Sequence, residues 1–227
     1  MGIKHQIGRV VFALGSRLSG RTLTSIDNLL NYMAVGQWTR ARGLRAVPSF
    51  RDKYRLFERI ARDVAHQRTL YLEFGVFQGA TMRVWSKLLQ NPSSQLHGFD
   101  SFEGLPEDWS LLERRGLFST GGVVPVLDDP RVKFFKGWFE DVLPTYSPPE
   151  HDQLVVSLDA DLYTSTLYVL RWLKPHVVPG TYLYFDEFRH RHHEMKAFTE
   201  FEQETGMQFE AIGESLCWQH AAFRRTG

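Results

Sequence analysis

The sequence predicts an α/β protein built on a doubly wound, mostly parallel sheet. Two observations carry this prediction. From Thr69 onward, short apolar runs typical of buried strands alternate with stretches whose apolar residues recur at helical spacing. Several apolar runs also end in an acidic residue, as in Phe99-Asp100 and Leu158-Asp159. Alternating units of this kind place parallel strands side by side, with helices on both faces of the sheet.

Residues 1–68 are expected to form an N-terminal helical segment that covers a second unit, residues 69–227. Apolar residues recur at helical spacing over residues 7–34, which predicts two helices divided near Gly20. The stretch from Gly36 to Pro48 is rich in arginine and glycine and is typical of a loop. Ser49 is expected to cap a helix that ends near Ala65.

The second unit divides into strands, helices and one long loop. Strands are predicted near residues 70–74, 95–99, 132–135, 154–158 and 182–185, and helices near residues 79–90, 164–174 and 192–205. Two final strands, near residues 207–212 and 216–224, are expected to form a hairpin across Gly213. Glycine and proline recur over residues 102–129, and a loop of that length is often functional.

The turn after the first predicted strand indicates a bound cofactor. A dinucleotide fingerprint needs a middle glycine where the turn Gly75-Val-Phe-Gln-Gly79 carries Phe77. S-adenosylmethionine has no phosphate and does not need that glycine, and Glu73 can hold its amino group directly or through water. A tight turn without a ligand is the alternative.

Two later positions fit the same cofactor. Asp100 ends the second predicted strand, where an acid can accept the hydroxyls of a ribose. Trp138 follows the third strand and can stack on an adenine, although core packing is an equal alternative. The predicted cofactor-binding residues are Glu73, Gly75, Gly79, Asp100, Ser101, Gly137 and Trp138.

Four carboxylates follow the fourth and fifth strands of this unit, namely Asp159, Asp161, Asp186 and Glu187. Uncompensated carboxylates repel one another, so a cation is a natural partner, and oxygen ligands suit Mg²⁺. Asp161 can instead act as a general base on a substrate hydroxyl. The alternative is that these acids only cap the following helices.

Composition sets further bounds. The 227 residues are 43% apolar and 23% charged, which is ordinary for a globular protein. The single cysteine excludes an internal disulfide and a zinc site of several cysteines. No apolar run approaches the ~20 residues of a membrane span. We expect a cytoplasmic protein without stable membrane insertion.

Charge divides the chain into two parts. Residues 1–68 hold 13 Lys/Arg and 4 Asp/Glu, whereas residues 69–227 hold 14 and 22. The basic part can pair with the acidic part within or between subunits, or form a solvated face. A nucleic-acid or membrane role is disfavoured, because no aromatic residue is interleaved among Arg40, Arg42 and Arg45.

Five motifs together resemble the macrocin O-methyltransferase type of class I S-adenosylmethionine-dependent methyltransferases. They are Leu72-Glu-Phe-Gly-Val-Phe-Gln-Gly79, Phe99-Asp-Ser-Phe-Glu-Gly-Leu-Pro106, Lys136-Gly-Trp-Phe-Glu-Asp-Val-Leu-Pro144, Leu158-Asp-Ala-Asp-Leu-Tyr-Thr-Ser-Thr166, and Pro179-Gly180 before Asp186. The resemblance implies a Rossmann-like sheet of seven strands with a reversed last strand, and an N-terminal segment that shapes the acceptor pocket and a dimer contact.

The resemblance also implies methyl transfer to a hydroxyl, assisted by Mg²⁺. It makes Asp159, Asp186 and Glu187 the metal ligands and Asp161 the base, although the family usually has Asp-Asp where this chain has Asp186-Glu187. We therefore expect an O-methyltransferase acting on a small hydroxylated acceptor such as a sugar. A metal-independent methyltransferase and a non-catalytic nucleotide-binding protein are the alternatives.

Overall fold

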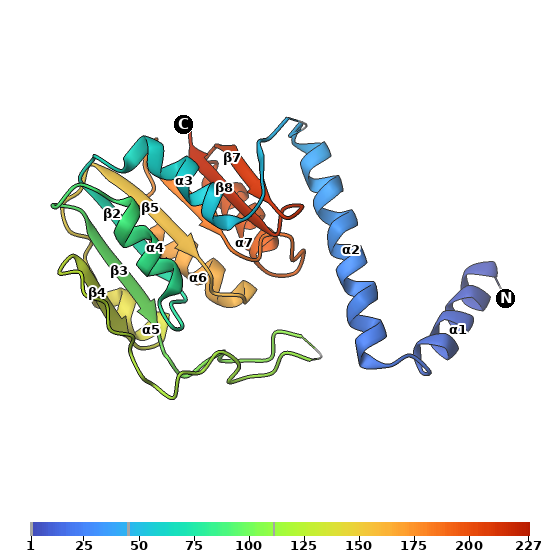
Figure 1. Ribbon diagram of the computed structural model, residues 1–227. Coiled ribbons are helices and arrows are strands. Elements are labelled where there is room, and N and C mark those ends of the chain that lie inside the picture. Colours follow the sequence, from blue (N-terminus) through green and yellow to red (C-terminus); the bar gives the residue numbers. More distant parts are fainter. Residues whose placement is uncertain (1, 45, 111) are drawn as a thin grey trace.

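The computed structural model of the chain describes residues 2–44, 46–110 and 112–227, and its centre is one sheet (Figure 1). The eight strands lie in the order β1-β7-β8-β6-β5-β2-β3-β4. Their bounds are β1 Ser49–Phe50, β2 Thr69–Phe74, β3 Gln95–Asp100, β4 Val132–Lys136, β5 Gln153–Leu158, β6 Tyr182–Phe185, β7 Phe209–Ser215 and β8 His220–Arg225. The sheet is the predicted α/β, Rossmann-like arrangement.

Strand direction agrees with the fold class expected. Strands β2, β3, β4, β5 and β6 pair in parallel with their neighbours in this group. The last strand, β8, runs antiparallel to both β6 and β7, so the reversed last strand is confirmed. The two-residue strand β1 is an addition to the seven strands expected, and it pairs in parallel with the outer side of β7.

The helices cover both faces of this sheet. Their bounds are α1 Ile3–Gly15, α2 Gly20–Ala41, α3 Lys53–Val64, α4 Ala80–Leu88, α5 Phe139–Val142, α6 Tyr163–Leu173 and α7 Glu194–Thr205, with a 3₁₀ turn at Leu143–Thr145. One core cluster joins α3 and α4 to the sheet, and the other joins α6, α7 and part of α2 to it. The two clusters are the two sides of a doubly wound fold.

Two expected boundaries in the N-terminal segment are wrong. Asp52, not Ser49, caps α3, because its side chain accepts the backbone N–H of Arg55, while Ser49 joins strand β1. Helix α2 continues to Ala41, through part of the stretch expected to be a loop.

The final hairpin turns after Ser215 rather than at Gly213, which lies inside β7 beside an irregularity in the pairing with β8. Three consecutive residues with positive φ, Leu216, Cys217 and Trp218, make the turn. A glycine therefore does not mark this turn.

The N-terminal helices extend away from the sheet (Figure 1). The later part of α2 packs on the domain, where Trp38 meets Phe188, Trp218 and Phe223. Arg191 of the domain pairs with Asp27 of α2 at 2.6 Å. Among the described helices none is both long and apolar enough to cross a membrane. The division into residues 1–68 and 69–227 stays a prediction, although α3 shares a core with the sheet.

Arg131 holds the loop before β4 against the end of α4. Its guanidinium donates to the carbonyls of Leu89 (2.7 Å) and Ser86 (2.6 Å) and to the carboxylate of Asp129 (2.7 Å). We expect Arg131→Met to lower the free energy of unfolding by about 3 kcal/mol, because it leaves a largely buried carboxylate without its cation. Denaturant unfolding measures the change.

The matched control is Arg55→Met, which removes an exposed ion pair with Glu58 on the surface of α3. Exposed pairs of this kind contribute little, so the control should stay within about 0.5 kcal/mol of the wild type. Equal losses in the two variants would contradict the role given to Arg131.

Candidate active site

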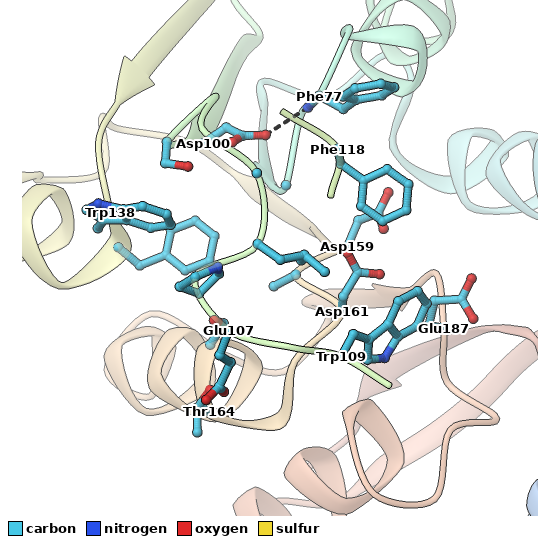
Figure 2. A pocket seen from close by; sticks show the side chains of 18 of the residues that line it. Phe77, Asp100, Glu107, Trp109, Phe118, Trp138, Asp159, Asp161, Thr164 and Glu187 are labelled. Atoms are coloured by element: carbon cyan, nitrogen blue, oxygen red, sulfur yellow. Dashed lines mark hydrogen bonds between the residues drawn. The ribbon is translucent and has the colours of Figure 1, made fainter. Parts of the chain in front are cut away.

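A cavity of ≈ 680 Å³ opens where the parallel strands end (Figure 2). Its floor comes from the residues that follow β2, β3, β5 and β6, and its walls come from the segment after β4, from residues within 101–109 and from Phe118. Ligands of doubly wound sheets bind at this edge. The cavity is large enough for a cofactor and a small acceptor together.

The closest backbone approach in the floor joins the turn after β2 to the end of β5. A Cβ atom on Gly75 would lie 1.8 Å from the carbonyl oxygen of Asp159, and the φ of Gly75 is +91°. Strands β2 and β5 end level with each other, with Phe74 opposite Leu158, so their following residues meet. Only glycine fits at position 75.

Asp100 ties the turn after β2 to the loop after β3. One carboxylate oxygen accepts the backbone N–H groups of Val76 and Phe77, both at 2.8 Å, and the other accepts that of Phe102 at 2.7 Å. A carboxylate offers about four lone-pair sites. Asp100 therefore has room for one further donor, not for the two ribose hydroxyls that its position in the sequence suggests.

The predicted cofactor-binding residues divide into two groups. Gly75, Asp100, Ser101, Gly137 and Trp138 line the cavity. The other two, Glu73 and Gly79, are not part of the described cavity wall.

Glu73 is buried and lies outside the described cavity wall. Its side chain is 1% exposed and accepts the hydroxyl of Tyr71 at 2.8 Å. Burial raises the pKa of Glu73 to about 8. Burial thus disfavours the charged form of Glu73, and its role in holding an amino group stays a prediction.

Asp161 is held in an unusual conformation at the cavity wall. Its φ is +58°, which is uncommon for a residue with a side chain and is often found at functional sites. Burial, together with the nearby charge of Asp186, raises the pKa of Asp161 to about 7. Burial and the charges of Asp186 and Asp161 raise the pKa of Asp159 well above its usual value.

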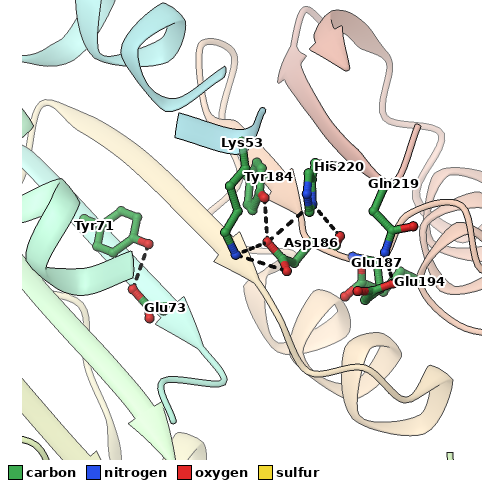
Figure 3. A network of polar contacts seen from close by, with 9 residues as sticks. All are labelled: Lys53, Tyr71, Glu73, Tyr184, Asp186, Glu187, Glu194, Gln219 and His220. Atoms are coloured by element: carbon green, nitrogen blue, oxygen red, sulfur yellow. Dashed lines mark hydrogen bonds and ion pairs between the residues drawn. The ribbon is translucent and has the colours of Figure 1, made fainter. Parts of the chain in front are cut away.

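Asp186 has its partners within the chain (Figure 3). Its two oxygens lie 3.0 and 3.3 Å from Nζ of Lys53, and one also accepts the hydroxyl of Tyr184 at 2.6 Å. Burial by itself would lower the pKa of Lys53, but the charges of Asp186 and Asp159 hold it above its usual value. The Glu187 carboxylate accepts the side-chain N–H of Gln219.

These contacts do not suit the predicted metal site. Asp159, Asp186 and Glu187 all line the cavity, but lysine and glutamine donors engage the last two. Over the described part of the chain, no three acidic, histidine or cysteine side chains converge to hold an ion. In this arrangement the three residues do not fit a divalent cation, and their role as metal ligands stays a prediction.

The first part of the loop predicted at residues 102–129 contributes to the cavity wall, through Gly104, Leu105, Pro106, Glu107, Trp109 and Phe118. Leu105 and Leu117 are joined by a backbone hydrogen bond of 2.9 Å, which folds the loop back on itself. The Glu107 carboxylate accepts the hydroxyl of Thr164 at 2.8 Å and so ties the loop to α6.

Trp109, from the same loop, lies beside two histidines of the segment after β6. Its ring centroid lies 5.2 Å from that of His190 and 6.3 Å from that of His193. Both imidazoles are partly buried, and burial lowers the pKa of His193 to about 4. Trp109 lines the cavity, whereas the two imidazoles pack against it without being part of the described cavity wall.

Reasoning from the sequence did not single out Lys53, Glu107, Trp109 or Thr164 as site residues. Glu107 and Trp109 lie in a loop whose apolar residues follow neither helical nor strand spacing. The tryptophan, which is uncommon in loops, is the one sign in the sequence that this segment could contact a ligand. Lys53 is one of many basic residues in the N-terminal segment. Its partner lies 133 positions later in the chain.

We expect Gly75→Ala to disrupt the floor of the cavity, because the added methyl group would overlap the carbonyl of Asp159. The control is Gly116→Ala, whose φ is also positive, at +82°, but which meets no atom within 4 Å. Both changes strain the backbone by about 1 kcal/mol, so only the clash distinguishes them. Thermal unfolding should show a much larger fall in melting temperature for Gly75→Ala, and equal falls would refute the close approach.

Comparisons with known proteins agree with this fold. The structure of the O-methyltransferase NovP superposes with a TM-score of 0.62 and 24% identity, covering 77% of this chain and 80% of that one. CalS11, a calicheamicin methyltransferase, superposes with a TM-score of 0.59 and 20% identity, covering 76% and 77%. At these identities the likeness shows the fold.

Sequence relatives share up to 34% identity over parts of their length. They include the 8-demethyl-8-(2,3-dimethoxy-alpha-L-rhamnosyl)-tetracenomycin-C 4'-O-methyltransferase of Streptomyces olivaceus, 32% identical over 52% of each chain. They also include the mycinamicin III 3''-O-methyltransferase of Micromonospora griseorubida, 31% identical over 41% of this chain and 34% of that protein. The demethyldecarbamoylnovobiocin O-methyltransferase of Streptomyces niveus is 34% identical over 39% and 40%.

The matched segments span about half or less of the length of these curated relatives. The family model of Macrocin-O-methyltransferase (TylF) matches residues 125–225, which include the acids after β5 and β6. By these matches the chain is similar to the macrocin-O-methyltransferase (TylF) family over residues 125–225, and its fold is that of the two methyltransferase structures above.

Proposed function

We propose that the protein is an S-adenosylmethionine-dependent O-methyltransferase acting on a hydroxyl of a small natural product. The observation that carries the proposal is a single cavity, lined by the turn at Gly75, by Asp100 and by Asp161. A cofactor end and a base therefore face the same space. A protein that only binds a nucleotide does not need a buried, strained aspartate at the far side of the pocket.

The donor end of the cavity suits an adenosyl group. Gly75 and Gly137 leave the backbone uncovered, and Trp138 and Phe139 supply aromatic faces beside them. Asp100 accepts one ribose hydroxyl through its remaining lone pair. When bound, S-adenosylmethionine supplies its sulfonium methyl group, and the electron pair of the breaking C–S bond stays on sulfur.

Asp161 is the proposed general base at the other end. Its carboxylate removes the proton of the acceptor hydroxyl as that oxygen forms its bond to the methyl carbon. The proton stays on Asp161 until it passes to solvent, so charge and atoms balance. A base works best when its pKa lies near the working pH, and the pKa of Asp161, raised to about 7, fits that role.

Sugar hydroxyls are the acceptor class that the relatives suggest. Two of them carry names that place the methyl group on a 4' or a 3'' hydroxyl of a glycosylated compound. Trp109, which lines the cavity, offers an apolar face to a sugar ring. A glycosylated polyketide or a similar compound is the proposed acceptor.

The sequence also predicts that a divalent metal ion assists the methyl transfer. Such assistance requires Lys53 to leave the Asp186 carboxylate, and we derive no step through a metal. The homo-oligomer and the cytoplasmic location stay predictions as well.

Trp138→Ala should weaken binding of S-adenosylhomocysteine about 10-fold, because it removes an aromatic face beside the adenine. Isothermal titration measures the affinity directly. Trp109→Ala serves as the control, since it lies at the acceptor end and should leave that affinity within about 2-fold. A wild-type chain that does not bind S-adenosylhomocysteine would end the proposal.

Asp161→Asn should lower kcat by about 10³-fold while S-adenosylhomocysteine still binds, because the amide keeps the shape of the side chain but accepts no proton. Transfer of labelled methyl groups to a panel of glycosylated polyketides measures the rate. Asp152→Asn, at the exposed opposite end of β5, is the control and should leave kcat unchanged. Full activity in Asp161→Asn would show that another residue acts as the general base.

A further inference from the structure

Lys53 is the first residue of α3 and lies on the face of the helix that meets the sheet. Leu56, Phe57 and Ile60 follow at steps of three, four and seven residues, and each is 0% exposed. Residues at these spacings share one side of a helix. Packing of that side therefore fixes where the lysine side chain begins and directs it toward the strand ends.

The ammonium group reaches the Asp186 carboxylate at the end of β6 (Figure 3). It lies 3.0 Å from Oδ1 and 3.3 Å from Oδ2, so it contacts both oxygens that a metal ion would use. The Tyr184 hydroxyl donates to Oδ1 at 2.6 Å, and the side chain of Asp186 is only 13% exposed. The carboxylate is thus held by donors of the chain itself.

His220 supports the same arrangement from β8. Its Nδ1 lies 2.7 Å from the backbone carbonyl of Asp186 and 3.5 Å from Oδ1. On the other side of Asp186, the Glu187 carboxylate is directed to Gln219. The two consecutive acids therefore point to different partners and do not present a shared pair of oxygens.

Charge explains why the lysine and the acids depend on each other. The first turn of a helix carries a partial positive charge, so a lysine there is unfavourable unless anions lie nearby. Asp159, Asp161, Asp186 and Glu187 all line one cavity and repel one another without a cation. In the described residues, lysine and arginine ion pairs to these four acids come from Lys53 alone.

We propose that Lys53 is a built-in cation that takes the place of a divalent metal beside Asp186 and Asp159. The wild-type chain then binds no divalent ion at these residues, and methyl transfer proceeds without metal. Lys53 acts as a positioning residue, because it neutralises and orients Asp186 rather than touching the acceptor. The part that concerns methyl transfer rests on the proposed function, whereas the exclusion of metal does not.

Binding of Mn²⁺ alone tests the proposal independently of activity. Electron paramagnetic resonance counts the free ion while the full chain is titrated. The wild type should withdraw no ion at this site, whereas Lys53→Met should withdraw one equivalent per chain. Adding Asp159→Asn to Lys53→Met should release that equivalent. Lys53→Arg, which keeps the charge, should behave as the wild type.

Two further variants serve as controls for this titration. Lys53→Gln still donates a hydrogen bond to Asp186 and replaces Lys53→Met if the latter lowers the melting temperature. Lys87→Met removes an exposed lysine in the last turn of α4 and should not create a site. The Mn²⁺ titration of the wild type tests the absence of a bound ion even if a variant fails to fold.

Activity gives a second readout. The wild type should keep its rate in chelator, and Lys53→Met should lose about 100-fold in chelator and recover with added Mn²⁺. A structural role for Lys53 alone would not produce recovery by metal. Absence of S-adenosylhomocysteine binding and methyl transfer in the wild type would refute the proposed function, but the Mn²⁺ titration would still decide the role of Lys53.

Two results would overturn the proposal. The first is a wild-type chain that binds one Mn²⁺ which Asp159→Asn releases, because Lys53 would then yield its place to the metal. The second is a folded Lys53→Met or Lys53→Gln that binds no Mn²⁺, because something other than the lysine would then keep the ion out.

Discussion

The contact between Gly75 and the carbonyl of Asp159 is the constraint on which the rest of the site depends. Strands β2 and β5 are parallel neighbours that end level with each other, so the chain leaving each one must share the same narrow space. With no side chain at position 75, the turn after β2 passes directly over the end of β5. Asp100 can then reach the backbone N–H groups of Val76 and Phe77, and the turn becomes rigid.

The same geometry concentrates negative charge. Parallel strands bring their carboxyl ends to one edge, and here β5 and β6 are both followed by acids. Each acid adds to the electrostatic cost of its neighbours because the site is largely shielded from water. Protonation relieves this repulsion, and so does a cation at this edge, whether it is an ion from solution or a side chain. Lys53 supplies such a cation from a helix on a different layer of the fold.

The sequence predicts the features of this site that depend on local patterns. Apolar runs identify the central strands, and an acid or a glycine at the end of each run indicates the cavity edge. Asp100, Asp159 and Asp161 all line the cavity, and their roles stay predictions. Local rules fail where two signals compete. Ser49 and Asp52 are both good caps, and the pairing of Ser49 with β7 decides between them. Gly213 suggests a turn, but the hairpin turns on three residues that carry side chains.

Lys53 shows a limit of a different kind. Its charge and its helix are visible in the sequence, but its importance comes from a carboxylate 133 positions away, and only tertiary packing brings the two together. The same holds for Glu73. It is next to the glycine turn in the sequence, but its side chain lies on the same face of β2 as Tyr71 and accepts a hydrogen bond from the Tyr71 hydroxyl. Successive residues of a strand point to opposite faces of the sheet, so a position next to a motif does not decide which face the side chain lies on.

The two ends of the cavity are built by different means, and this bears on how an acceptor is selected. The donor end is formed by strand ends and by backbone groups that Asp100 ties together, so a change of side chain there disturbs the fold as well as binding. The acceptor end is formed by Glu107, Trp109 and Thr164, which lie on segments outside the sheet. Their side chains can change without moving Gly75 or Asp100. The structure thus allows acceptor preference to vary while the cofactor end stays intact, provided that the cation beside Asp186 is kept.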